Sequence, residues 1–73
     1  MQITVNGKSI EFSGSIIDYG TVLAYADEPA GASVTYRGPK DGDGQRSGIL
    51  HAQSQPIVVQ DGMVFNAIRT GNA

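Results

Sequence analysis

The first twelve residues alternate apolar and polar side chains in two runs, with a break at Asn6-Gly7. Alternation is typical of a strand with one buried face, so residues 1–5 and 8–12 are predicted strands. Asn-Gly between such runs is the strongest two-residue hairpin signal, because a type I′ turn needs positive φ at both positions. The turn predicts three cross-strand pairs: Val5 with Lys8, Ile3 with Ile10, and Met1 with Phe12. Cross-strand partners share a face, so the apolar members of these pairs are expected on one face of the hairpin, which is buried.

A short helix is predicted next. Asp18 suits the N-cap position, because its carboxylate can accept a free backbone N–H of the first turn. Ile17 and Val22 are placed for a hydrophobic staple around this cap. Asp-Glu-Pro at 27–29 closes the helix, since proline disfavours helical geometry in the residue before it. Four side chains at i, i+3, i+4 and i+7 form one buried stripe: Tyr19, Val22, Leu23 and Ala26.

The remaining residues predict further strands. Residues 32–36 are β-branched and alternating, which indicates a third strand. Residues 37–47 are polar and glycine-rich, and we expect them to form the longest and most mobile loop. Residues 48–50 are expected to form a short strand or turn that packs two apolar side chains, and residues 56–59 a further extended piece. Asp61-Gly62 predicts a tight hairpin turn and no more, before a last strand over residues 63–69.

These elements predict an α+β sheet with one helix packed across it. The first and last strands are expected to be central, parallel neighbours, with the helix in the crossover between them. Alternation places Phe65 and Ala67 of the last strand, and Val34 and Tyr36 of the third, towards the helix. The outer face of the sheet then carries the remaining members of these strands: Thr35, Val64, Asn66 and Ile68.

Composition narrows the classes of function. The chain has 73 residues, enough for one domain and not for two. Its formal charge of -2 argues against nucleic-acid binding, and no apolar run approaches the ~18 residues of a membrane span. We see no signal peptide, so a cytoplasmic location is expected. The chain has no cysteine and a single histidine, His51, which is interpreted as a surface or loop residue. We therefore expect no enzyme activity, no metal and no cofactor.

Two apparent motifs are rejected. Asp41-x-Asp43 resembles part of a calcium loop, but it lacks the terminal bidentate glutamate. Gly42-Asp43-Gly44 lacks the lysine and the following helix of a phosphate-binding loop.

Three stretches of the chain resemble the bacterial multiubiquitin family of ubiquitin-like β-grasp domains, which occur singly or in tandem arrays. They are VNGK at 5–8, VTYRG at 34–38 and DGMVFN at 61–66. The resemblance runs from Gln2 to about Thr70. It implies a β-grasp domain over residues 1–70, with a mixed four- to five-stranded sheet, followed by a flexible tail of residues 71–73.

The resemblance implies a protein modifier. Family members are typically encoded beside an adenylating enzyme, a conjugating enzyme and a zinc peptidase, and related operons act in defence against phage. The C-terminal carboxylate would be activated as an acyl-adenylate with ATP that the partner uses, passed to a partner's cysteine, and joined to a protein target. The modifier itself then needs a rigid body for docking and a slender tail.

The candidate conjugation tail is Thr70-Gly71-Asn72-Ala73. It lacks the terminal Gly-Gly of ubiquitin, so Ala73, Gly71 and Asn72 all stay open as the attachment residue. The residues alone favour an ordinary frayed terminus. Arg69 at the strand exit either steers the tail into an acidic partner groove or is a solvated charge.

Ubiquitin docks most partners through an apolar patch on its outer sheet face. The matching residues here are Thr35, Asn66 and Ile68, with Arg69 beside them, which predicts a more polar docking face. The alternative is that they are plain solvent-facing strand residues.

Three other functions compete with the modifier. A sulfur carrier of the β-grasp type needs a C-terminal Gly-Gly, and this chain ends differently. A non-covalent binding or scaffold module needs no reactive tail. A small enzyme is disfavoured by the missing acid, base and metal-binding residues.

Overall fold

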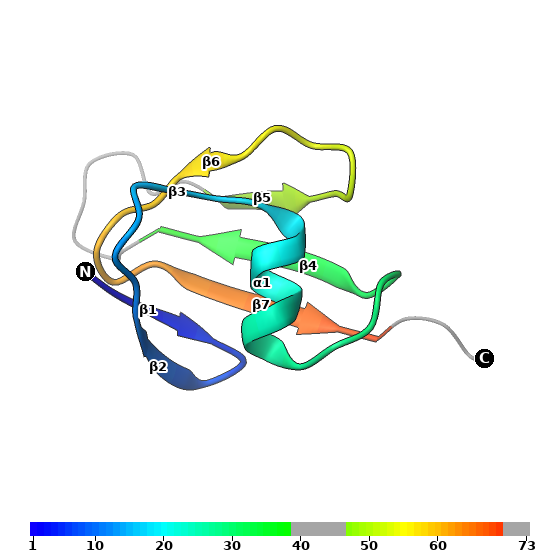
Figure 1. Cartoon of the computed structure of the whole chain (residues 1–73), viewed down its shortest axis with the longest axis horizontal. Coiled ribbons are helices and arrows are strands. Elements are labelled where there is room, and N and C mark those ends of the chain that lie inside the picture. The colour runs from blue at the N-terminus through cyan, green and yellow to red at the C-terminus, as the bar shows by residue number, and fades with distance from the viewer. Residues whose placement is uncertain (39–46, 70–73) are drawn as a thin grey trace.

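The computed structural model describes residues 1–38 and 47–69. Five strands form one mixed sheet in the order β2-β1-β7-β4-β5, and two short strands, β3 and β6, form a separate ladder. The helix α1 lies across one face of the large sheet, so the chain is a small α+β fold (Figure 1). The elements are β1 (Gln2–Val5), β2 (Lys8–Glu11), β3 (Ile16–Ile17), α1 (Tyr19–Ala26), β4 (Ser33–Arg37), β5 (Ser47–Leu50), β6 (Ile57–Val58) and β7 (Val64–Ile68).

The predicted N-terminal hairpin is confirmed in type and register. Asn6 and Gly7 have φ of 51° and 82°, and the strands pair Val5 with Lys8 and Ile3 with Ile10. Beyond the ladder, the Phe12 N–H donates to the Met1 carbonyl at 2.7 Å. The burial predicted for Met1 is wrong, since 41 % of this residue is exposed. Met1 lies at the end of β1 that is remote from α1, where the helix cannot cover it (Figure 1).

The predicted central pairing is also confirmed. β1 and β7 are parallel neighbours, with Val5 opposite Phe65, and β4 pairs antiparallel with the other side of β7. Parallel neighbours need a crossover connection, and α1 lies within the chain segment that connects β1 to β7. The predicted alternation holds as well. Phe65, Ala67 and Val34 are buried, and Tyr36 is half-buried.

Both ends of α1 are fixed by local hydrogen bonds. Asp18 has extended geometry, and its Oδ1 accepts the Thr21 N–H at 2.9 Å. Hydrogen bonding to Thr21 holds the pKa of Asp18 below its ordinary value. The helix ends at Ala26, and Asp27 caps it in left-handed geometry at φ 58°. The next N–H, that of Glu28, donates to the Leu23 carbonyl at 3.1 Å. A left-handed cap therefore closes the helix before Pro29 is reached.

The ladder between β3 and β6 is absent from the predictions. Ile16 pairs with Val58 and Ile17 with Ile57. Asp61-Gly62 forms the predicted turn, with Gly62 at φ 88°, but not a hairpin, because β6 and β7 are in different sheets. The turn instead holds the start of β1. The Asp61 Oδ1 accepts the N–H of Gln2, and the Gly62 N–H donates to the Gln2 carbonyl, both at 2.7 Å.

Two predictions around β5 need correction. Arg37 and Ser47, placed in the long loop, are strand residues that pair with each other. The predicted mobility of that loop, with Asp41 and Asp43, concerns residues 39–46 and lies outside the described residues. Leu50 is buried, but Ile49 is 59 % exposed, so residues 48–50 pack one large apolar side chain and not two. Successive strand residues point to opposite faces of a sheet.

Candidate functional site

The outer face of the large sheet presents two exposed isoleucines. Ile49 of β5 pairs with Thr35 of β4, and Thr35 pairs with Asn66 of β7, so these three residues form one row across three strands. Ile68 follows two residues after Asn66 on the same face, and it is 62 % exposed. We call Thr35, Ile49, Asn66 and Ile68 the outer patch.

The outer patch is more apolar than the predicted docking face. Thr35, Asn66 and Ile68 lie together as predicted, but Ile49 was assigned to the interior. The alternation of β5 could have placed Ile49 outside once Leu50 was assigned to the core. Arg37 lies on the same face, opposite Val64, and adds a positive charge near the patch.

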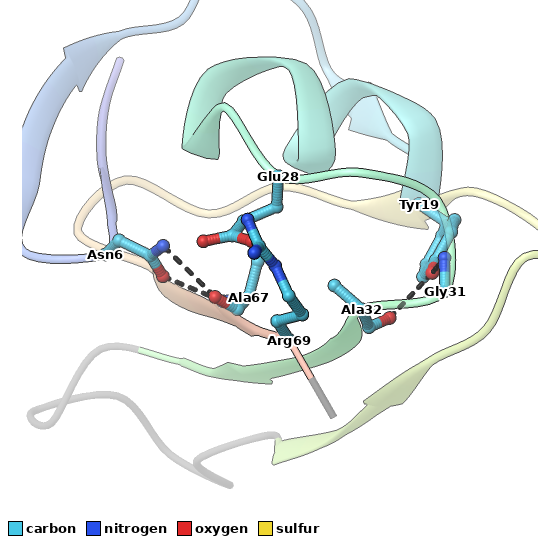
Figure 2. Close-up of polar contacts among 7 residues, drawn as sticks. All are labelled: Asn6, Tyr19, Glu28, Gly31, Ala32, Ala67 and Arg69. Atoms are coloured by element: carbon cyan, nitrogen blue, oxygen red, sulfur yellow. Dashed lines mark hydrogen bonds and ion pairs between the residues drawn. The ribbon is translucent and has the colours of Figure 1, made fainter. Parts of the chain in front are cut away.

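Arg69 does not belong to this face. Its Nε lies 3.5 Å from the Oε1 of Glu28, which follows α1 on the opposite side of the sheet. Figure 2 shows the Arg69 side chain directed towards Glu28. The structure therefore places the Arg69 side chain apart from Thr35, Asn66 and Ile68, with which it was grouped. Side chains of β7 alternate between faces, and residue 69 falls in phase with the inward Phe65 and Ala67.

The end of β7 is held by a side chain from the hairpin. The Asn6 Oδ1 accepts the Ala67 N–H at 2.7 Å, and the Asn6 Nδ2 donates to the Ala67 carbonyl at 3.1 Å (Figure 2). The amide thereby satisfies both backbone groups of Ala67, as a neighbouring strand would. The sequence indicated only a turn role for Asn6, and no local pattern predicts a contact 61 residues away.

A second side chain joins the start of α1 to the approach to β4. The Tyr19 hydroxyl donates to the Ala32 carbonyl at 2.6 Å and accepts the Gly31 N–H at 3.1 Å (Figure 2). Tyr19 was predicted on the buried stripe, and it is half-buried with its hydroxyl bonded in this way. The contact fixes the helix over the strand that carries Thr35.

The predicted conjugation tail, Thr70, Gly71, Asn72 and Ala73, lies outside the described residues. The residues that precede the tail are fixed by strand pairing on both sides of β7. β7 is the middle strand of the large sheet, and Ile68 pairs with Ser33 of β4. The tail therefore starts from a central strand that Asn6 holds on its other side.

A separate apolar region lies near the small ladder. Ile16 and Val58 pair with each other and are 55 % and 57 % exposed. Next to Val58 is a cavity of about 240 Å³. It is lined by Tyr36, Pro56, Ile57, Val58 and Met63.

The rest of the described chain adds little chemistry. His51 is exposed in a turn, as predicted, and its N–H donates to the Ser54 Oγ at 3.0 Å. Within residues 1–38 and 47–69, no group of three or more His, Cys, Asp or Glu side chains is arranged to hold a metal ion. No helix in the same part of the chain is long and apolar enough to cross a membrane.

The arrangement therefore combines an exposed patch with two isoleucines, the outer patch, and a firmly held strand end at β7. Comparisons of the chain with models of protein families, with curated protein sequences and with solved structures gave no match.

Proposed function

We propose that the chain is a bacterial ubiquitin-like modifier of the β-grasp type, joined to a protein target through its C-terminal carboxylate. The observation that carries this proposal is the placement of β7. This strand is central, parallel to β1, and leads directly to the tail, while α1 covers one face of the same sheet. A rigid body with a reactive tail leaving its central strand is what such a modifier requires.

The chemistry in this proposal is supplied by partners. An adenylating enzyme joins the tail carboxylate to the AMP part of ATP and releases pyrophosphate. A cysteine thiolate of a partner then displaces AMP to form a thioester, and a conjugating enzyme passes the acyl group to a nucleophile of the target. A zinc peptidase processes or removes the modifier, and the system acts in defence against phage. The modifier contributes recognition and no catalytic group.

The outer patch supports the docking part of the proposal. Its two isoleucines are each about 60 % exposed, and Arg37 lies on the same face. Exposed apolar side chains in a cluster commonly mark a protein-binding surface. A partner with an apolar centre and an acidic rim would complement this face.

The decisive experiment is a pyrophosphate exchange assay with ATP and the adenylating enzyme that the proposal requires, sought among the neighbouring genes. The intact chain should support exchange, and a chain that ends at Thr70 should not. The truncated chain should keep its melting temperature, because the core of the described chain ends at Ala67. Exchange that survives truncation would refute the modifier function.

Placing a bulky residue in the tail gives a finer test. Gly71→Val should slow transfer and leave the melting temperature unchanged, because a β-branched side chain obstructs passage through a narrow active site. Thr70→Ala is the matched control, since it changes the tail without adding bulk and is not one of the three candidate attachment residues. Mass spectrometry of the conjugates would identify whether Ala73, Gly71 or Asn72 forms the bond.

A non-covalent binding module is the second candidate, and the outer patch itself favours it. Two exposed isoleucines around Thr35 and Asn66 can bind a partner without any tail chemistry. Under this alternative, a chain that ends at Thr70 binds its partner as tightly as the intact chain. Under the modifier proposal, the truncated chain still docks but forms no covalent product.

A further inference from the structure

The carboxylate of Glu28 is partly buried just after the C-terminal end of α1. Its backbone belongs to the cap of α1, where its N–H donates to the Leu23 carbonyl at 3.1 Å. Only 22 % of its side chain is exposed. Its Oε1 is shielded from solvent and accepts no hydrogen bond from the residues that the structure describes.

Two features of this position favour a positively charged partner for Glu28. A carboxylate oxygen that is shielded from solvent and accepts no hydrogen bond, as Oε1 is here, loses part of its hydration. The C-terminal end of a helix is also the negative end of its dipole, which repels an anion. The last turn of α1 holds no basic residue. The compensating charge comes from Arg69, 41 positions later, with its Nε 3.5 Å from the Oε1 of Glu28.

This ion pair constrains the residue from which the tail begins. The Arg69 side chain is 67 % exposed, so packing alone leaves it many rotamers. Attraction to Glu28 selects those on the helix side of the sheet. Two residues earlier, Asn6 holds both backbone groups of Ala67. Contacts from two distant segments, the hairpin and the helix cap, therefore meet at the end of β7 (Figure 2).

We propose that Glu28 is a positioning residue for the C-terminal tail. It holds the Arg69 side chain on the helix side of the sheet, at the residue from which the tail begins. This inference rests on the proposed function, because it is the reactive tail that is to be presented. A tail whose root is already oriented loses less conformational freedom when a partner's active site takes it up.

The first test needs no partner. The ¹⁵N order parameter of the Arg69 Nε–H is measured in the wild type, in Glu28→Gln and in Glu11→Gln. The last variant is a matched control, because the carboxylate of Glu11 forms an exposed ion pair with the terminal ammonium of Met1 at 3.2 Å. The order parameter should fall in Glu28→Gln alone. An unchanged value in Glu28→Gln would overturn the positioning role.

The second test uses the adenylating enzyme. Glu28→Gln should raise the KM for the modifier about three- to tenfold with kcat unchanged, as expected when preorganisation of a bound group is lost. The exchanged pair, Glu28→Arg with Arg69→Glu, should return KM towards the wild-type value. A pair variant that folds but keeps the high KM would show that the partner reads the charge of Arg69 itself, and the positioning role would be rejected.

The two tests, the order parameter and the KM, distinguish a failure of this inference from a failure of the proposed function. If the wild type supports no adenylate formation, the modifier function fails, and the order parameter still decides whether Glu28 orients Arg69. If the wild type is active and Glu28→Gln has an unchanged KM, the modifier function stands and the role of Glu28 is rejected.

Discussion

The side-chain amide of Asn6 continues the pairing of β1 with β7 after the β1 backbone has turned away. It bonds the N–H of Ala67 at 2.7 Å and the carbonyl of the same residue at 3.1 Å. The left-handed geometry of Asn6, at φ 51°, both makes the hairpin turn and leaves the amide beside β7. One residue therefore links the first turn of the chain to the strand that precedes the tail.

Replacing Asn6 separates these two roles. Glycine adopts positive φ without strain, so Asn6→Gly keeps the turn and removes both hydrogen bonds to Ala67. Asn6→Asp keeps an acceptor for the N–H but places a carboxylate against the carbonyl. We expect each variant to lower the free energy of unfolding by about 1–2 kcal/mol in urea denaturation. The control is Asn66→Asp on the exposed outer face, and equal stability of all variants at pH 7 would show that the contact with Ala67 contributes nothing.

Phe65 should be indispensable for folding. It is completely buried in β7, and its ring lies 6.4 Å from that of Tyr36. Phe65→Ala should cost about 3–5 kcal/mol through the cavity it leaves, which is comparable to the whole stability of so small a domain. Circular dichroism should show a largely unfolded chain. Ile68→Ala, on the exposed face of the same strand, is the control, and it should melt within a few degrees of the wild type.

The cap of α1 predicts how stability depends on pH. The hydrogen bonds to Thr21 hold the pKa of Asp18 below its ordinary value of 3.8 in the folded state. The ionised cap therefore stabilises the fold fully above pH 3.8, and the contribution is lost as pH falls through the lower folded pKa. Asp18→Ala should lose about 1 kcal/mol at neutral pH, a typical loss for an N-cap.

Asp18→Asn supplies the control for this prediction, because its amide oxygen still accepts a hydrogen bond but does not titrate. Its stability relative to the wild type should rise as the pH falls below 3.8. A constant difference between the two proteins from neutral to acidic pH would contradict the assigned cause.

The outer patch should affect binding and not stability. Ile49→Ser with Ile68→Ser removes two exposed side chains, so the melting temperature should change little. Affinity for the adenylating enzyme, measured by calorimetry, should fall about tenfold or more, as for the central residues of an interface. The matched control, Ile16→Ser with Val58→Ser, removes the exposed pair of the small ladder. Equal loss of affinity in both variants would mean that the outer patch is not the docking surface.

Elements that depend on neighbouring residues alone could be predicted from the sequence. The register of the hairpin follows from Asn6-Gly7, because the turn fixes which residues face each other. The N-cap at Asp18 follows from side-chain chemistry within one turn of helix. The inward placement of Phe65 and Val34 follows from the two-residue period of a strand, and all of these agree with the structure.

Contacts between residues far apart in the chain could not be predicted in this way and depend on the complete fold. β3 and β6 have two residues each, too few for any period, so their pairing depends on where the large sheet leaves them. The contact of Asn6 with Ala67 and the ion pair of Glu28 with Arg69 join segments about 60 and 41 positions apart. Such contacts depend on the order and register of strands across the whole sheet, which no local pattern encodes.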